Sequence, residues 1–317
     1  GMLGWRTGQF PPPFMEWNDR YRDAVRRFWV GDVRSQRHHH RGHGLQELAT
    51  RLAGSRDLFG HRDRGPTAPI NFVAAHDGFT TADLVAYDTK HNEANGEDNR
   101  DGSDNNGSWN HGTEGPSDDP QVIADRTLAI RNLMGTLLLS TGVPMINAGD
   151  ELGRSQGGNN NPYCQDNGTS WINWDLEPWQ QDLLDTTSHL IRVRQALPVL
   201  RQRVWALGRQ VHDDGTRDME WYAADGTPMG DRWTQGSRLV QLYVAGAWMG
   251  WDSALLVVNG GVEDGEVTLH EAPGVTTYRL LWDSTWSRPR DGGDPVVPGP
   301  VTVGATSLRV YAASDVS

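Results

Sequence analysis

The sequence predicts an α/β region over roughly the first 200 residues, followed by an all-β region. In the first region, segments with helical periodicity alternate with short apolar runs that end in polar residues, a pattern typical of a parallel sheet with helices between its strands. Beyond it the apolar runs are short, glycine, proline and aspartate separate them, and no convincing helix intervenes. A length of 317 residues suffices for two modest domains.

Four segments of the first region have the pattern of amphipathic helices. Residues 21–29 and 45–52 carry apolar side chains at i, i+3 and i+4, so one face of each helix can be buried. The strongest helix covers residues 122–140 and follows Pro120, a residue favoured in the first turn of a helix. A helix over residues 183–197 closes the region.

Short apolar runs predict buried strands at residues 70–75 and 143–148, with a third candidate at residues 14–17. Two of these runs lead directly into carboxylates. In α/β enzymes the catalytic groups lie at the C-terminal ends of the strands. The candidate site residues at these ends are His76, Asp77, Asp150 and Glu151.

The second region predicts an antiparallel β-sandwich over residues 201–317, after a first domain at residues 1–200 and a boundary near residues 198–203. Its strand-like runs lie at residues 239–244, 255–258, 278–281 and 308–311.

Composition excludes several classes of protein. The formal charge of −12 argues against binding a nucleic-acid backbone, and the apolar runs are far shorter than the roughly 20 residues of a membrane span. We find no signal-peptide pattern. The single cysteine, Cys164, excludes an internal disulfide. We therefore expect a cytoplasmic protein that contacts neither nucleic acid nor membrane.

A long polar segment at residues 92–119 resembles a calcium loop only superficially. Asp101, Ser103 and Asn105 fall on alternate positions, but the glycine and glutamate that an EF-hand requires further on are absent. A second candidate metal site is a cluster of four histidines, His38, His39, His40 and His43. It has no carboxylate or cysteine partners at ligand spacing, and we interpret it as a solvated connector. No metal or cofactor is expected.

Other hydrolytic chemistries lack their motifs. His76 and Asp77 alone could belong to a hydrolytic triad or form a structural pair, but no Gly-x-Ser-x-Gly nucleophile elbow is present. Nothing around Cys164 marks it as a nucleophile, and the chain has no Walker-type or dinucleotide-binding glycine loop.

Several longer strings resemble one family. Phe-Val-Ala-Ala-His-Asp at residues 72–77 resembles the fourth conserved region of the α-amylase superfamily of glycoside hydrolases, and residues 142–151 resemble its later region at the eighth barrel strand. Further strings are similar to bacterial glycogen debranching enzymes of the isoamylase type. They lie at residues 16–29, 91–102, 108–112, 158–167 and 225–229.

The resemblance implies a retaining hydrolase of α-1,6 branch points in glycogen or limit dextrin. Retention requires a nucleophile and an acid/base about 5–5.5 Å apart. Asp77 matches the position of the transition-state stabiliser, and His76 would bind sugar hydroxyls. The nucleophile motif is missing, because the string that matches it best, residues 4–8, has no carboxylate. The acid/base motif is missing as well. The resemblance therefore implies strands six to eight of a TIM (β/α)8 barrel, followed by the sandwich, in a chain that is inactive alone.

Other site assignments stay open between two interpretations. Trp109, with Asn110, could offer a stacking platform for glucose or merely pack its loop. Asp150 and Glu151 could contact substrate or satisfy backbone groups, and we favour the structural role. Trp171 and Trp174 are expected to pack beneath the site. For Trp205, Trp221, Trp248 and Trp251, core packing is the default and a secondary glucan site is the alternative.

An incomplete barrel exposes sheet edges and apolar surface. We therefore expect self-association, or pairing with a separate N-terminal barrel piece. The alternative to an enzyme fragment is a non-catalytic remnant that binds α-glucan or a partner protein.

Overall fold

The computed structural model describes residues 7–42, 44–234 and 236–315. Three short parallel strands, in the order β1-β2-β3, form the sheet of the first region: β1 (Glu16–Asn18), β2 (Pro69–Asn71) and β3 (Val143–Pro144). The third candidate strand of the sequence is thus present, shifted to β1. The two strands predicted over six residues each are shorter than expected. The reason is that the ladder between them consists only of Ile70 with Val143 and Asn71 with Pro144, after which each chain leaves the sheet.

The helices of the first region follow the predicted pattern closely. The longest are α5 (Pro120–Leu139) and α6 (Pro178–Ala196). Asp119 caps α5, since its side chain accepts a hydrogen bond from the Gln121 amide at 2.8 Å. The remaining helices are α1 (Asp19–Arg26), the π turn η1 (Arg27–Gly31), α2 (Asp32–Arg37), α3 (Leu45–Leu52), α4 (Arg56–Phe59) and the 3-10 turns η2 (Asp83–Val85), η3 (Glu93–Asn95), η4 (Asp150–Leu152), η5 (Pro198–Arg201), η6 (Gly230–Thr234) and η7 (Ala247–Met249).

Antiparallel strands make up the second region. The larger sheet has the order β4-β5-β6-β10-β8, and a two-stranded sheet pairs β7 with β9. The four predicted runs correspond to β5, β6, β8 and β10. The bounds are β4 (Met219–Tyr222), β5 (Leu239–Val244), β6 (Ser253–Asn259), β7 (Gly265–Thr268), β8 (Val275–Asp283), β9 (Pro300–Val303) and β10 (Ser307–Asp315).

The larger sheet is buried on both faces. Along β6, Leu256 and Val258 pack into a core shared with the helices. Leu255 and Val257 point to the opposite face, where they meet a second cluster that contains Val267 of the small sheet. This alternation follows from the two-residue period of a strand, and it explains why the predicted runs are apolar throughout.

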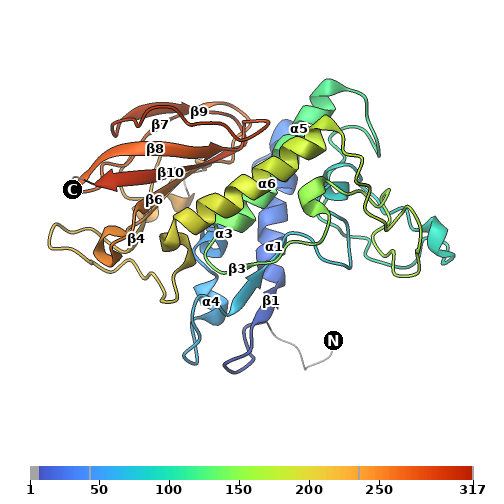
Figure 1. The fold of residues 1–317 in the computed structure, drawn as a ribbon, viewed down its shortest axis with the longest axis horizontal. Helices are drawn as coiled ribbons and strands as arrows, with labels where there is room; N and C mark the ends of the chain where they lie inside the picture. Colours follow the sequence, from blue (N-terminus) through green and yellow to red (C-terminus); the bar gives the residue numbers. More distant parts are fainter. Residues whose placement is uncertain (1–6, 43, 235, 316–317) are drawn as a thin grey trace.

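One hydrophobic core joins the two regions. It includes Leu133 of α5, Leu190 of α6 and Trp282 of β8, all fully buried. Side chains also cross the junction, since Asn132 donates to the Thr306 carbonyl at 2.7 Å. Figure 1 shows α5 and α6 lying between the antiparallel sheets and the segment that carries β1. The division into domains at residues 1–200 and 201–317 stays a prediction.

Within the described ranges, no helix is both long enough and apolar enough to cross a membrane.

Candidate substrate cleft

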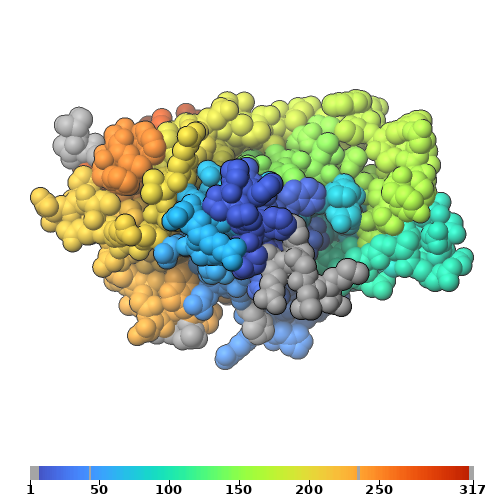
Figure 2. Space-filling model, turned by 90° about the horizontal axis from the view of Figure 1, so that it is seen from below, coloured from blue at the N-terminus to red at the C-terminus, as the bar shows by residue number. Residues whose placement is uncertain are grey.

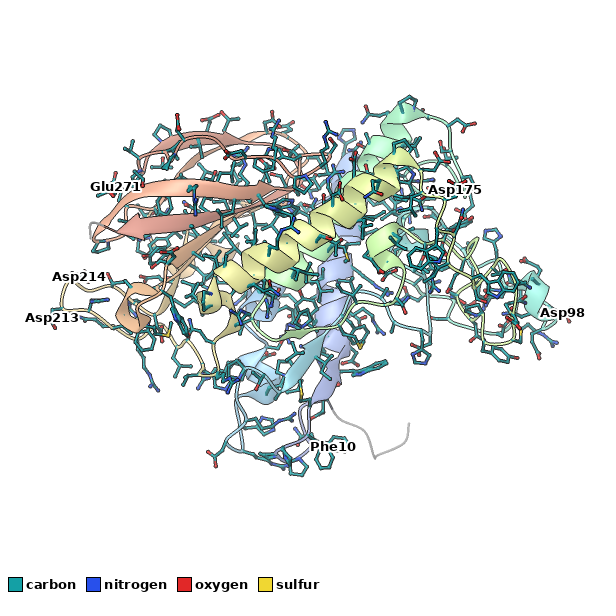
Figure 3. All side chains as sticks on the ribbon, in the orientation of Figure 1. Phe10, Asp98, Asp175, Asp213, Asp214 and Glu271 are labelled. Carbon is teal, nitrogen blue, oxygen red and sulfur yellow. The ribbon has the colours of Figure 1, made fainter. Side chains whose placement is uncertain are left out.

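A polar cleft of about 760 Å³ lies where the chain leaves β2. Its walls come from the helical segment α1-η1-α2, from Asp77 and Gly78 after β2, from residues 102–108 of the long polar loop, and from Asn160 with Asn161. Figure 3 shows this long loop extending away from the antiparallel sheets, with Asp98 near its outer end.

His76 and Asp77 lie next to each other after β2, and Asp77 lines the cleft. Their side chains are 77% and 74% exposed, and His76 Nδ1 is 3.9 Å from Asp77 Oδ1. The His76 ring meets Trp17 of β1 edge to face, with ring centres 5.9 Å apart. The Asp77 carboxylate accepts no hydrogen bond from the described residues, so it is free to face a ligand.

The turn after Asp77 depends on a glycine. Gly78 has a φ of +117°, in a region that side chains with a Cβ rarely adopt. Its amide donates to the Asn160 carbonyl at 2.8 Å. The end of β2 is therefore fixed to the segment that forms the opposite wall of the cleft.

Arginines of one helical face line the other side, and the sequence reasoning assigned none of them to the site. Arg22, Arg26, Arg27 and Arg34 all border the cleft. The π turn sets the direction of Arg34, because the Asp32 amide bonds to the Arg27 carbonyl five residues back.

In an uninterrupted α-helix, residues 30 and 33 would continue the face of Arg26. Here Val30 and Val33 are buried in the core, and Gly31 and Arg34 reach the cleft instead. The i, i+4 spacing of Arg22 and Arg26 was a signal for this face, but the π turn was not visible in the pattern.

Arg26 connects three parts of the cleft. Its Nε donates to the Val73 carbonyl at 2.7 Å, and a terminal nitrogen donates to the Asn106 carbonyl at 2.9 Å. Burial lowers the pKa of Arg26 to about 9, and nearby carboxylates, Asp77 among them, oppose that change. Arg26 therefore stays charged at neutral pH and holds the polar loop against the chain that follows β2.

Amide side chains hold the long polar loop in place. Oδ2 of Asp101 accepts hydrogen bonds from Asn95 and Asn161, at 2.8 and 2.9 Å. Asn92 Nδ2 donates to Asn160 Oδ1 at 2.9 Å, and the Asn160 amide donates back to Asn92 Oδ1. These bonds place Asn160 and Asn161 on the cleft wall.

Trp109 and Asn110 serve the loop itself in this structure. The Trp109 ring is buried in the core and stacks on His111, with ring centres 4.1 Å apart. Asn110 Nδ2 donates to Glu114 at 3.0 Å, and its Oδ1 accepts from the Gly112 amide at 2.8 Å. The arrangement corresponds to the loop-packing interpretation, and Trp109 presents no free face for a sugar.

Asp150 and Glu151 lie behind the cleft, bonded to backbone amides. Asp150 is buried and accepts from the Thr81 amide at 2.9 Å. Burial raises its pKa to about 6. Glu151 accepts from the Gly149 amide at 2.9 Å. Both contacts agree with the structural role that we favoured.

The expectation that Trp171 and Trp174 pack beneath the site is wrong. Their side chains are 61% and 75% exposed, because the chain between η4 and α6 runs over the surface. Among the described residues, no group of three or more His, Cys, Asp or Glu side chains could hold a metal ion. His43 lies outside the described residues.

Comparisons with known proteins agree with the motifs. No family model matches the chain. The glycogen debranching enzyme of Pectobacterium atrosepticum is 43% identical over 273 residues, which are 86% of this chain and 38% of that protein. The glycogen operon protein GlgX homolog of Mycobacterium bovis is 40% identical over an alignment of 320 residues, which covers 96% of this chain and 42% of that protein. The chain thus spans about two fifths of the length of these curated relatives.

Solved structures show the same architecture. Pullulanase from Bacillus acidopullulyticus superposes with a TM-score of 0.67 at 18% identity, over 98% of this chain and 33% of that one. Pullulanase from Anoxybacillus sp. LM18-11, complexed with maltotetraose, gives 0.63 at 18% identity, over 96% of this chain and 35% of that one. The fold is therefore that of part of these pullulanases.

The sequence identity to the curated relatives decides the family. The chain belongs to the family of bacterial glycogen debranching enzymes, and it corresponds to their C-terminal part. The resemblance stated from the motifs is confirmed.

Proposed function

We propose that this chain is the portion of a debranching glycoside hydrolase that supplies the transition-state stabiliser and part of the substrate cleft. The proposed substrate is a branched α-glucan, glycogen or limit dextrin, cleaved at α-1,6 linkages. The observation that carries the proposal is the free, exposed carboxylate of Asp77 at the end of β2, within a cleft lined by arginine and asparagine side chains.

The chemistry of glycoside cleavage gives these groups their roles. Positive charge develops on the sugar ring in an oxocarbenium-like transition state, and the ionised Asp77 would stabilise it electrostatically. His76, 3.9 Å away at its nearest nitrogen, would bind hydroxyls of the same sugar. Arg22, Arg27 and Asn161 would donate hydrogen bonds to neighbouring glucose units.

We further propose that the chain alone does not catalyse hydrolysis. A retaining mechanism requires two further carboxylates about 5–5.5 Å apart. Besides Asp77, Asp23 is the one carboxylate among the cleft-lining residues described. Asp23 is paired with Arg22 Nε at 2.7 Å, which suits a cleft wall better than a nucleophile.

The missing groups would come from a further part of the barrel. In this proposal β1, β2 and β3 are barrel strands six to eight, and the second region is the appended β-sandwich. Within the described residues, β1 and β3 each pair on one side only. Phe14, Met15 and Trp17 beside the β1 edge are exposed. Figure 2 shows the dark-blue segment of the chain near its N-terminus between the yellow-to-orange and the green-to-teal parts. A separate N-terminal barrel piece, or a second copy of the chain, would cover this edge.

A chimera tests the enzymatic proposal. Residues 7–317 would replace the corresponding C-terminal part of the Pectobacterium atrosepticum enzyme, and release of linear chains from glycogen would be measured. We expect activity in the chimera and a loss of at least about a hundredfold in its Asp77→Asn variant, because a charge-stabilising group is removed. The matched control is Asp98→Asn, on the exposed outer loop. Equal activity of the Asp77→Asn chimera would remove Asp77 from the mechanism.

The isolated chain is the second arm of the test. We expect no release of linear chains from it. Measurable release that Asp77→Asn abolishes would contradict the proposed inactivity.

The alternative is a non-catalytic module that binds α-glucan. It is favoured by a cleft whose walls are already held together by Gly78, Arg26 and Asn160, so binding needs no further barrel strands. Calorimetry with maltoheptaose tests it, since undetectable heat at millimolar sugar would exclude a binding module. Cytoplasmic location stays a prediction.

A further inference from the structure

A second hollow, of about 420 Å³, lies between the helices α3 and α4 and the edge strand β4. We propose that it is a second carbohydrate-binding site, which takes a short segment of an α-glucan chain. That the sugar is an α-glucan rests on the proposed function, while the site itself rests on the geometry of the hollow.

The hollow is separate from the cleft at Asp77. The residues lining the two spaces have no member in common. Strand β4 and helix α4 lie on the side of the molecule away from the long polar loop (Figure 1). A ligand here would therefore be held at a distance from the reacting sugar. The volume falls within the range of about 300–1,000 Å³ that is usual for small-molecule sites.

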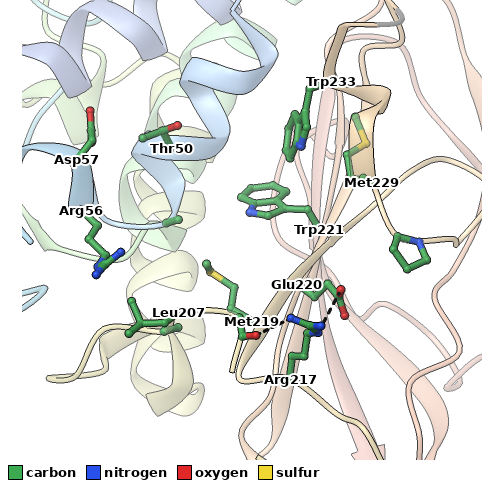
Figure 4. Close-up of a pocket in the computed structure, with 15 residues that line it drawn as sticks. Thr50, Arg56, Asp57, Leu207, Arg217, Met219, Glu220, Trp221, Met229 and Trp233 are labelled. Atoms are coloured by element: carbon green, nitrogen blue, oxygen red, sulfur yellow. Dashed lines mark hydrogen bonds and ion pairs between the residues drawn. The ribbon is translucent and has the colours of Figure 1, made fainter. Parts of the chain in front are cut away.

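Two tryptophans form the apolar wall. Trp221 of β4 and Trp233 of η6 meet edge to face, with ring centres 5.6 Å apart. Both are only partly buried against the core. Figure 4 shows their rings directed into the space that faces Thr50 and Asp57. Flat aromatic faces combine apolar area with little loss of conformational freedom on binding, and they suit the apolar faces of sugar rings.

The remaining wall carries hydrogen-bonding groups of both kinds. Arg217 and Glu220 form an ion pair at 3.6 Å at one end of the hollow (Figure 4). Arg56 and Asp57 lie across from them. Asp57 is bonded to Arg51, whereas the Arg56 guanidinium has no hydrogen bond or ion pair with any described residue. Arg56 is thus an exposed donor beside the aromatic wall.

This combination selects the class of ligand. Two cationic and two anionic side chains line the hollow, so a strongly charged ligand of either sign would meet repulsion. A purely apolar ligand would leave these charged groups without partners when it excluded water. A neutral ligand with many hydroxyls satisfies donors and acceptors together, and its ring faces can pack on the tryptophans.

Indole N–H resonances of the full chain provide a test that locates the ligand. Maltoheptaose is titrated into the 15N-labelled protein. The signals of Trp221 and Trp17 are assigned by substituting each tryptophan in turn. Trp17 reports on the neighbourhood of Asp77 in the cleft, because its ring lies 5.9 Å from that of His76, which adjoins Asp77. We expect the Trp221 signal to shift saturably, and calorimetry to show about a tenfold loss of affinity at this site in Trp221→Ala.

The outcomes separate this proposal from the proposed function. Shifts of Trp221, with or without Trp17, support the second site, and shifts of Trp221 alone count against glucan binding in the cleft. Shifts of Trp17 alone overturn the second site and leave the cleft intact. No shift in either overturns the second site and also counts against a glucan-binding cleft.

Matched variants guard against a folding defect. Trp248→Ala removes an exposed tryptophan of the same region that does not line the hollow, and we expect it to leave the titration unchanged. Arg56→Ala removes a side chain without a partner, so the fold is kept, and a severalfold weaker interaction at Trp221 is expected. Unchanged affinity in both Arg56→Ala and a folded Trp221→Ala overturns the proposal.

Discussion

The parallel sheet and the larger antiparallel sheet differ in the length of their strands. The parallel strands β1, β2 and β3 are only two or three residues long, and within the described residues both outer strands lack a second neighbour. The antiparallel strands run for four to nine residues, and the central ones are covered on both faces. The candidate catalytic residues follow the short strands. Because the pairing of the short strands stops early, His76 and Asp77 leave the sheet and are exposed. The longer strands form a rigid support.

The largest expected effect concerns the junction between the two regions. Trp282 is fully buried, and its ring packs so closely on α5 that a Cβ at Gly135 would lie 2.4 Å from it. Trp282→Ala should lower the free energy of unfolding by about 4 kcal/mol, measured by urea denaturation. If the regions share one core, far-UV circular dichroism and the exchange of amides in α1 will report a single transition. Separate transitions would show that the two regions unfold as independent domains.

Trp282→Phe is the matched control. It keeps an aromatic ring and removes the indole N–H, which has no partner among the described residues. We expect a clearly smaller loss of stability than with alanine.

The next effect concerns the start of the parallel sheet. Glu16 of β1 forms a buried ion pair with Arg64, and it also accepts a hydrogen bond from the Gly8 amide at 2.7 Å. Glu16→Ala leaves the arginine charge buried without its partner, so we expect a loss of about 3 kcal/mol in unfolding free energy. Glu16→Gln retains the acceptor oxygen and should lose less. Equal losses in the two variants would show that the hydrogen bonds contribute little.

A smaller effect is a dependence on pH behind the cleft. The pKa of Asp150, raised by burial to about 6, lies above that of an unfolded aspartate, so the folded protein binds the extra proton. Stability from this group is present at acid pH and is lost as pH rises through 6. Between pH 5 and 7.5 the wild type should lose about 1 kcal/mol more than Asp150→Asn, measured as the change in urea midpoint at constant slope. Parallel pH profiles of the two proteins would contradict this assignment.

The smallest effect is expected on the exposed segment before α6. Trp171 makes one side-chain hydrogen bond, from its indole N–H to Asp166 at 3.0 Å. Trp171→Ala should change the free energy of unfolding by less than about 0.5 kcal/mol. A larger loss in thermal or urea unfolding would mean that this surface tryptophan packs more than the structure shows.

Sequence periodicity predicted the regular elements well. Helix α3 covers the predicted residues 45–52, and the runs that became β5 and β6 were found within a residue or two. These elements form because one or both of their faces are buried, and the spacing of apolar residues in the sequence follows directly from that burial. His76 and Asp77 were found because a strand and a motif ended at the same place.

Other features escaped sequence reasoning for physical reasons. The strand at residues 70–75 was predicted too long because residues 72–75 are buried without being paired, and burial alone does not distinguish the two. Trp171 is exposed where packing was expected, and the sequence left Trp109 open between two interpretations, since the path of an irregular loop decides the exposure of its side chains. The place of Arg34 on the cleft could not be predicted from a 3.6-residue period, because the π turn departs from that period.

That π turn also has an evolutionary meaning. A π turn holds one residue more than an α turn, so deletion of one residue within 27–31 would let the helix close regularly while Arg34 stayed on the cleft. Insertion of a residue into the regular stretch α1 would instead rotate everything beyond it by about 100°. Residues 27–31 are therefore the place in this helix where a change of chain length by one residue is best tolerated.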